Sequence, residues 1–274
     1  MQSRVSPGFS AKLARAGRVS RAAIARRVSD DDALADAWRA LWLSRLLVSV
    51  AGFAGVLAFG VSGRAADFDP AGLTSPFGAT GDVLAAPFAR WDSVWYLAIA
   101  DGGYGDGARA AFFPLYPLVV RVAGALLGSP LVAGALASTL LLGVALVLLH
   151  RLVALDHDRA VARNAVLVTA LSPMSFFFSA VYSESLFLAL SVGAVYAARR
   201  ERWAWAGVLG ALGAATRSAG VLLLVALLML YLWDTGSPLR RPRRALRADA
   251  LWLALVPLGL VAFCASLGLA GEDP

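Results

Sequence analysis

Long apolar stretches recur along this chain, and they constrain its fold more than any other feature of the sequence. A helix needs roughly 20 apolar residues to cross the hydrocarbon core of a membrane, and 59% of the residues here are hydrophobic. Backbone polar groups in lipid must be satisfied internally, which helices achieve. The sequence therefore predicts an all-α polytopic membrane protein with about seven transmembrane helices, expected over residues 46–61, 130–150, 163–198, 203–234 and 250–269.

Two of these stretches are too long for a single crossing. As one helix, residues 163–198 would reach about 54 Å at a rise of 1.5 Å per residue. Ser172-Pro173 interrupts them, because proline disfavours a helical conformation in the residue before it. Residues 203–234 lie between two basic loops, so they need an even number of crossings and a turn near residues 216–220. We expect each stretch to form two short helices.

The basic residues predict the orientation of these helices. A net charge of +7 would suggest nucleic acid in a soluble chain, but in a membrane protein it reflects arginine-rich cytoplasmic loops, so no nucleic-acid partner is expected. We expect residues 1–39 to be a disordered cytoplasmic tail and residues 40–274 to form the transmembrane domain. Arg45 is expected to snorkel at the cytoplasmic end of the first span. Residues 64–128, acidic in their first part, would form a large outer loop that contains interfacial helices.

The outer loop contains the most polar and aromatic passage of the chain, RWDSVWYLAIADGGYGDGARAAFFPLYP at residues 90–117. If its first part is helical, Asp92, Trp95 and Tyr96 share one face, because residues three and four apart are neighbours on a helix. That face would present a carboxylate between flat aromatic surfaces, which suits a sugar ring or a lipid head group. The alternative is an interfacial helix with its aromatic side chains in the head-group belt and Asp92 solvated or capping.

Two further polar turns are expected on the same outer side, SAVYSES around Glu184 and TRSAG around Arg217. We therefore expect Asp92, Glu184 and Arg217 to converge in space. The Asp92 carboxylate is the best candidate for a general base. Arg217 could hold a phosphate through its planar fork of donors, or else anchor a helix end. Tyr182, Ser183 and Glu184 could bind sugar hydroxyl groups, or this could be ordinary helix-start chemistry with Ser183 or Ser185 as the cap.

The sequence leaves metal binding undecided. Asp92, Asp101 and Asp106 could bind a divalent ion, but their spacing matches no strong motif. The single cysteine, Cys264, and the two histidines form no zinc-binding pattern.

Four motifs in order resemble one enzyme family. The chain contains, between about residues 90 and 225, RWDSVWYLAIADGGY, AFFPLYPLVVR, SPMSFFFSAVYSESLFLALS and GALGAATRSAGVLLL. Together they look like the bacterial branch of the PIG-V-type GPI mannosyltransferase family, which belongs to the GT-C glycosyltransferases. The resemblance implies a GT-C-like fold and an inverting transfer of mannose from a polyprenyl-phosphate-mannose donor. The acceptor hydroxyl would lie on the outer face of the cell membrane, on a glycolipid, a lipoglycan or a protein.

Carried over to this chain, the resemblance makes Asp92 the catalytic carboxylate of the first outer loop. The FFPLYP segment would help to guide the prenyl chain of the donor. Family members tend to be longer, so the chain is expected to be incomplete at its C-terminus. The residues expected to bind substrate are Arg90, Trp91, Ser93, Tyr96, Tyr182, Glu184 and Arg217.

A second class of function fits the same polar residues, namely a transporter or flippase of lipid-linked precursors, or a noncatalytic membrane partner of an enzyme. Transporters also contain broken helices and ionisable residues within the bilayer. Here, however, the charged residues cluster at the outer ends of the expected helices, no internal repeat is evident, and the first outer loop is larger than a transporter needs. The enzyme is therefore favoured, and the dependence of transfer on Asp92 separates the two.

Overall fold

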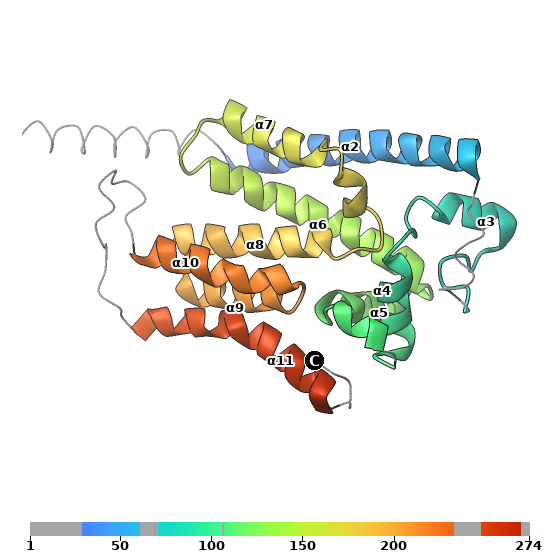
Figure 1. Ribbon diagram of the computed structural model, residues 1–274. Coiled ribbons are helices and arrows are strands. Elements are labelled where there is room, and N and C mark those ends of the chain that lie inside the picture. Colours follow the sequence, from blue (N-terminus) through green and yellow to red (C-terminus); the bar gives the residue numbers. More distant parts are fainter. Residues whose placement is uncertain (1–28, 61–68, 70, 106, 233–247, 270–274) are drawn as a thin grey trace, which may run out of the picture.

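A computed structural model of the 274-residue chain describes residues 29–60, 69, 71–105, 107–232 and 248–269 (Figure 1). Within these residues the secondary structure is entirely helical. The long helices run side by side, and the short helices of residues 78–85, 93–102 and 115–127 gather at one end of the bundle (Figure 1). The elements are α2 (Asp30–Phe59), α3 (Gly78–Ala85), α4 (Ser93–Gly102), η2 (Gly107–Ala111), α5 (Leu115–Leu127), α6 (Pro130–Val153), α7 (Arg159–Ala170), η3 (Ser175–Phe178), α8 (Glu184–Arg199), α9 (Trp203–Ala214), η4 (Ser218–Leu222), α10 (Leu223–Leu232), η5 (Ala248–Leu255) and α11 (Val256–Leu269).

Three helical segments of the described chain are long and apolar enough to cross a membrane, residues 30–59, 130–153 and 248–268. The first is α2, the second is α6, and the third combines η5 with α11. Helices α7 to α10 are shorter, with 10 to 16 residues each. The all-helical membrane class is confirmed, while the number of seven crossings stays a prediction.

Helix α2 begins earlier than the sequence analysis predicted. Ser29 and Asp32 form a capping box, in which each side chain accepts a hydrogen bond from the other residue's backbone N–H. Acidic residues in the first turn also favour a helix start here, because they complement the positive end of the helix dipole. Residues 30–39 are therefore helical and do not belong to a disordered tail, and residues 1–28 lie outside the described part of the chain.

The prediction that Arg45 snorkels at the cytoplasmic end of the first span is wrong. Arg45 lies in the middle of α2 and is buried. Its guanidinium donates hydrogen bonds to the backbone oxygen of Ser175 (2.8 Å), to the Ser179 hydroxyl (2.6 Å) and to the backbone oxygen of Ala170 (3.3 Å). A charged group within an apolar helix turns inward when polar partners are available there. Arg45 thus fixes the turn between α7 and α8 against α2.

Both expected breaks in the long apolar stretches are confirmed. Helix α7 ends at Ala170, just before Ser172-Pro173, and α8 begins at Glu184 after the short helix η3. Helix α9 ends at Ala214, and the chain reverses through residues 215–217 into η4 and α10. Both turns lie at the end of the bundle that also carries α4 (Figure 1).

Ion pairs of arginine with aspartate mark the opposite end of the bundle. Arg199 donates two hydrogen bonds to the Asp156 carboxylate, at 2.8 and 3.0 Å. Arg159 bonds Asp36, which is buried beside His150. This end is expected to be cytoplasmic, because arginine-rich loops are retained on that side.

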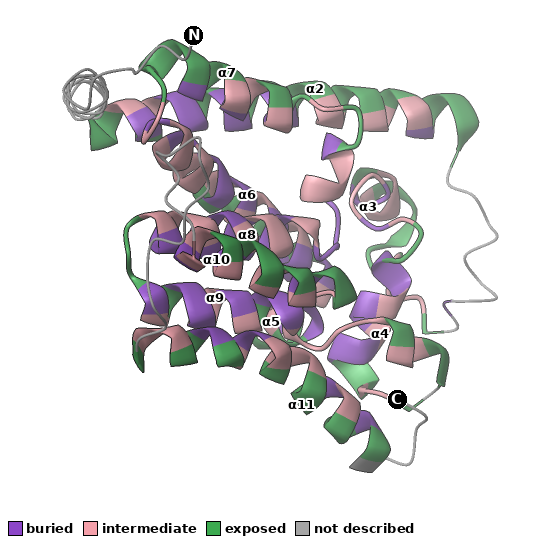
Figure 2. Ribbon diagram, turned by 60° about the vertical axis from the view of Figure 1, so that its left-hand side comes forward, coloured by how far each residue is buried: buried purple, intermediate pink, exposed green. Residues whose placement is uncertain are grey.

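Helices α6 and α8 form the centre of the bundle. Helix α6 packs against α2, α5, α7 and α8, and α8 packs against α9. The outer faces of the long helices are exposed and the inward faces buried (Figure 2), as expected for helices that meet lipid on one side. At the end of the bundle that carries α4, the hydroxyl groups of the fully buried Tyr116 and of Ser138 share a hydrogen bond of 2.7 Å. This contact ties α5 to α6 beneath the polar turns.

Candidate active site at the end of the bundle

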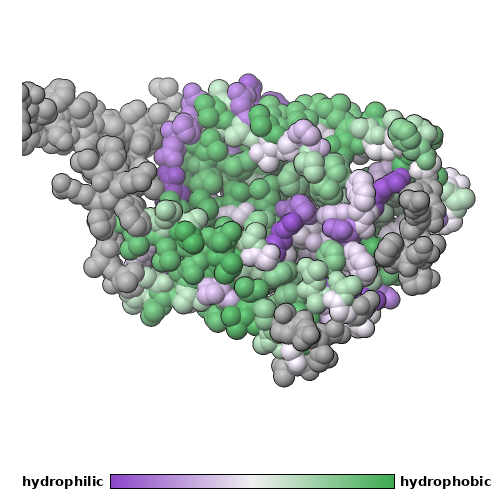
Figure 3. Space-filling view, in the orientation of Figure 1, coloured by the Kyte–Doolittle hydropathy of each residue, from purple (hydrophilic) through white to green (hydrophobic). Residues whose placement is uncertain are grey.

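Three charged residues that are far apart in sequence lie at the starts of three helices at one end of the bundle. Asp92 precedes α4, Glu184 is the first residue of α8, and Arg217 precedes η4. Two tyrosines also lie at this end: the hydroxyl group of Tyr182 contacts Asp92, and that of Tyr96 contacts Ser183, which precedes Glu184. A small group of hydrophilic side chains is visible on an otherwise largely apolar face of the molecule (Figure 3).

Asp92 has a fixed backbone and a free side chain. Its backbone N–H donates a hydrogen bond of 2.8 Å to the Tyr182 hydroxyl. Its carboxylate forms no capping bond to α4, so the capping alternative is wrong. Within the described residues no hydrogen bond or ion pair engages this carboxylate, and the residue is exposed. The carboxylate is therefore available to a substrate hydroxyl.

The backbone just before Asp92 is strained. Trp91 has a φ of 49°, in the left-handed region that bulky residues rarely adopt. Its ring lies 5.6 Å from that of Phe176 and 6.1 Å from that of Phe177, while the residue remains 66% exposed. Strain of this kind persists where surrounding contacts determine the backbone, and it clusters at functional sites. The strained residue thus stands directly beside Asp92.

Tyr96 and Ser183 form a buried support behind Asp92. Their hydroxyl groups are 2.9 Å apart. The Tyr96 ring makes edge-on contacts with Phe112 and Tyr116, at 5.2 and 5.1 Å. Because Ser183 uses its hydroxyl in this contact and forms no capping bond, the helix-capping alternative does not hold for it. Helix α4 begins only at Ser93, so Trp91 and Asp92 lie just before it, and Tyr96 is on its buried side whereas Asp92 is exposed.

Burial raises the pKa of both tyrosines at the site. The pKa of Tyr96 rises because the ring is desolvated, although its bond to Ser183 opposes the rise. Desolvation likewise raises the pKa of Tyr182, against the opposing effect of the Asp92 backbone bond. Both phenols therefore stay protonated at neutral pH, so they act here as hydrogen-bonding groups and carry no charge.

Glu184, at the start of α8, and Arg217, just before η4, form an ion pair. The side chains are 25% and 41% exposed, respectively, so solvent reaches the pair. Burial lowers the pKa of Arg217, but the hydrogen bond and the charge of Glu184 outweigh that effect and raise it. Arg217 therefore remains a cation at any working pH. The second carboxylate oxygen of Glu184 is buried and has no hydrogen-bond partner within the described residues.

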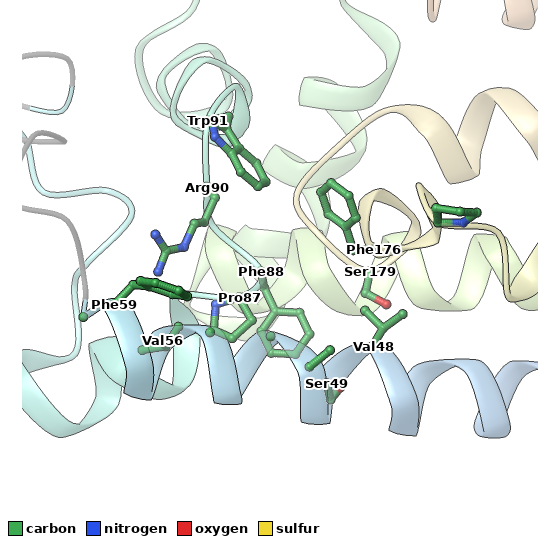
Figure 4. Close-up of a pocket in the computed structure, with 15 residues that line it drawn as sticks. Val48, Ser49, Val56, Phe59, Pro87, Phe88, Arg90, Trp91, Phe176 and Ser179 are labelled. Carbon is green, nitrogen blue, oxygen red and sulfur yellow. The ribbon is translucent and has the colours of Figure 1, made fainter.

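The remaining residues expected to bind substrate fall into two groups. Ser93 is fully buried, and its hydroxyl has no partner within the described residues, so like Tyr96 it lies behind the site. Arg90 and Trp91 instead line an apolar cavity of about 440 Å³ against α2 (Figure 4). Substrate contact by each of these residues stays a prediction.

No group of three or more potential metal-ligating side chains (His, Cys, Asp or Glu) occurs within the described residues. Asp101 is exposed at the end of α4, and Asp106 lies outside the described part of the chain. Within the described residues, Asp92 is therefore not part of a cluster of three or more such ligands, and metal binding stays undecided.

Sequence reasoning missed two contributors to this end of the molecule. Arg45 holds the turn that carries Phe176, and α2 provides the wall of the cavity beside Trp91. One signal was present: an arginine inside an apolar run points to an inward-facing polar contact. The cavity had no comparable signal, because it depends on how α2 meets the loop before α4.

A comparison with protein families matches the segment that contains this site. Residues 77–248, more than half of the chain, match the family described as Mannosyltransferase (PIG-V). The chain belongs to this PIG-V mannosyltransferase family. Asp92, Tyr182, Glu184 and Arg217 all lie within the segment that places the chain among the PIG-V proteins.

Curated relatives of the chain carry related names. A rat protein named GPI alpha-1,6-mannosyltransferase 2 is 36% identical over 151 residues, which are 51% of this chain and 31% of the rat protein. A Drosophila pseudoobscura protein named GPI mannosyltransferase 2 is 40% identical over 111 residues, 36% of this chain and 24% of that protein. The human GPI alpha-1,6-mannosyltransferase 2 is 35% identical over 137 residues, 46% of this chain and 28% of that protein. The matched segments thus span less than a third of these relatives. No solved structure is significantly similar to the chain.

Proposed function

We propose that this PIG-V family member transfers mannose from a polyprenyl-phosphate-mannose donor to an acceptor hydroxyl at the outer face of the membrane, with inversion at the anomeric carbon. The acceptor would be a glycolipid, a lipoglycan or a protein. The observation that carries the proposal is the exposed Asp92 carboxylate, which no described residue engages, at the same end of the bundle as the cationic Arg217. The arginine-rich end lies opposite, which supports an outer location of the site.

In the proposed reaction, Asp92 accepts the proton of the acceptor hydroxyl as the O–H bond breaks. The acceptor oxygen forms a bond to the anomeric carbon on the face opposite the phosphate. The bond between that carbon and the phosphate oxygen breaks, and its electron pair leaves with the polyprenyl phosphate. A backbone N–H fixed on Tyr182 holds Asp92 in place for this transfer.

Arg217 stabilises the negative charge that develops on the leaving phosphate, because a fixed cation acts without reorganising in the transition state. Glu184 orients the guanidinium through the ion pair and leaves it 41% exposed. The other carboxylate oxygen of Glu184 is buried and has no described hydrogen-bond partner, so a bond to it from a sugar hydroxyl stays a prediction.

The test compares mannosyl transfer in membranes that contain the unchanged chain, Asp92→Asn or Asp101→Asn. Asp101→Asn is the matched control, because Asp101 is exposed at the other end of the same helix. We expect Asp92→Asn to lower transfer from polyprenyl-phosphate-mannose by about 10²–10⁴-fold, the usual contribution of a general base, and Asp101→Asn to leave it unchanged. Equal transfer by all three forms would refute the role of Asp92. Movement of the lipid-linked sugar across the membrane that survives Asp92→Asn, without transfer, would instead indicate a transporter.

A further inference from the structure

An apolar cavity of about 440 Å³ lies between the second half of α2, the loop at residues 87–91 and the turn at residues 173–179. Its size falls within the range of about 300–1,000 Å³ that is typical of small-molecule sites. Figure 4 shows the side chains of Val48, Val56 and Phe88 along its floor, with Trp91 and Phe176 at the other side. The cavity therefore runs along a membrane-crossing helix and reaches the residue next to Asp92.

Two glycines of α2 line this space. A Cβ atom on Gly55 would have no heavy atom within 4 Å, so open space begins directly at the helix backbone. A Cβ on Gly52 would approach the Pro87 side chain to 3.0 Å, which shows how closely the loop meets the helix one turn earlier. The residues that follow on the other face of α2, such as Leu57, are strongly exposed, as expected for a surface in contact with lipid.

One cation stands at the rim of this apolar space. The Arg90 side chain reaches toward Phe59 at the end of α2 (Figure 4). Its Nε donates a long bond of 3.3 Å to the backbone oxygen of Ala86, and its terminal nitrogens have no partner within the described residues. Arg217, in contrast, shares its guanidinium with Glu184. An apolar groove with a free arginine fork at its mouth is complementary to an apolar chain that ends in a phosphate.

We propose that this groove holds the isoprenoid chain of a polyprenyl phosphate next to its phosphate group, and that Arg90 binds that phosphate. The inference rests on the proposed function and names the place of the donor's lipid, because Arg90 and Asp92 are separated by a single residue. It replaces the expectation that the FFPLYP segment guides the prenyl chain. The rings of that segment are already engaged, since Phe112 packs on Trp95 and Phe113 packs on Phe263.

The test is photolabelling of the full chain in nanodiscs with farnesyl phosphate that carries a diazirine on its terminal isoprene unit, followed by mapping of the labelled peptides. We expect label on residues 48–60 or 87–91. Gly55→Phe fills the groove and should lower labelling about tenfold or more, whereas Ala54→Phe adds the same ring to an exposed neighbour outside the lining and should not. Arg90→Gln should remove the advantage of unlabelled farnesyl phosphate over farnesol as a competitor, about tenfold for a charge-assisted hydrogen bond.

Label elsewhere in the chain, or labelling that Gly55→Phe and Ala54→Phe affect equally, would overturn the proposal. So would equal competition by dioleoyl phosphatidic acid, which would show a general anionic-lipid surface. The probe carries no mannose, so the result is independent of catalysis. Label in the groove without any mannosyl transfer supports the groove and counts against the proposed function, while transfer with label elsewhere does the reverse. If Gly55→Phe fails to fold, Arg90→Gln, at the rim, still decides the question.

Discussion

The ion pair of Glu184 with Arg217 allows a sharp test, because its effects on stability and on transfer should differ greatly in size. The two side chains are 25% and 41% exposed, so the pair is partly solvated. Such a pair contributes about 1 kcal/mol or less to the free energy of unfolding. The loss of a charge that stabilises a developing oxyanion costs far more in rate, about 10²–10³-fold. We therefore expect Arg217→Gln to fold almost normally and to be nearly inactive.

A charge reversal separates pairing from phosphate binding. Glu184→Arg and Arg217→Glu, each alone, place like charges together and should destabilise the turn. The double variant restores an ion pair, so its free energy of unfolding should return to within about 1 kcal/mol of that of the unchanged chain. It nevertheless puts a carboxylate where the phosphate would leave, so transfer should stay at the level of Arg217→Gln.

The assay combines detergent unfolding, followed by tryptophan fluorescence, with mannosyl transfer in membranes. Glu184 raises the pKa of Arg217, so Arg217 keeps its charge across the usual pH range. Titration of Arg217 should therefore make neither the unfolding midpoint nor the rate of transfer depend on pH. Recovery of transfer in the double variant to near the unchanged chain would refute the phosphate role. It would establish the alternative, in which Arg217 serves only to anchor the start of η4.

Three further predictions concern the framework of the site. Arg45→Met should lower the free energy of unfolding by about 2–4 kcal/mol, because buried acceptors lose their donor. Arg39→Met, on an exposed position of the same helix, should change it by less than about 0.5 kcal/mol, and equal detergent unfolding midpoints would contradict this. Gly220→Ala should cost at least about 1–3 kcal/mol, since its Cβ would lie 2.2 Å from a backbone oxygen of α9. Gly55→Ala should be neutral or slightly stabilising, because a Cβ at this position would meet open space. Similar expression and similar unfolding midpoints for Gly220→Ala and Gly55→Ala would argue against the packing described. Trp91→Gly should be about 1 kcal/mol more stable than Trp91→Ala, because only glycine relieves the positive φ, and a chemical unfolding series that ranks them equally would remove the case for strain.

The helix breaks and the grouping of the polar turns could be predicted because their causes are local. Pro173 interrupts its helix through its own ring and missing N–H. The turn before η4 follows from the basic residues on both sides of its stretch, which demand an even number of crossings. Once both turns lie on one side, Glu184 and Arg217 must come from the same end of the bundle as Asp92.

Other features depend on contacts between distant segments and had no such local cause. The acceptors of Arg45 lie 125 to 134 residues further along the chain, so its inward orientation needs the packed bundle. The groove beside Trp91 exists only because the loop at residues 87–91 meets α2 at Gly52. The start of α2 is a different case. Its capping box has a local signature, Ser29 followed three residues later by Asp32. The prediction nevertheless extended the tail to residue 39, because the residues before the first apolar stretch are mostly basic.

The contrast of Asp92 with Asp69 and Glu184 supports a catalytic use for Asp92. The Asp69 carboxylate accepts bonds from two backbone N–H groups and a threonine hydroxyl, which is how an acid organises a turn. Glu184 is held by Arg217. Asp92 differs from both: the Tyr182 hydroxyl binds its backbone N–H, while no described residue engages its carboxylate. A structural acid would lose stability on conversion to the amide, because its bonds depend on the carboxylate. Asp92→Asn removes no described contact, so a loss of transfer without a loss of stability would be chemical in origin.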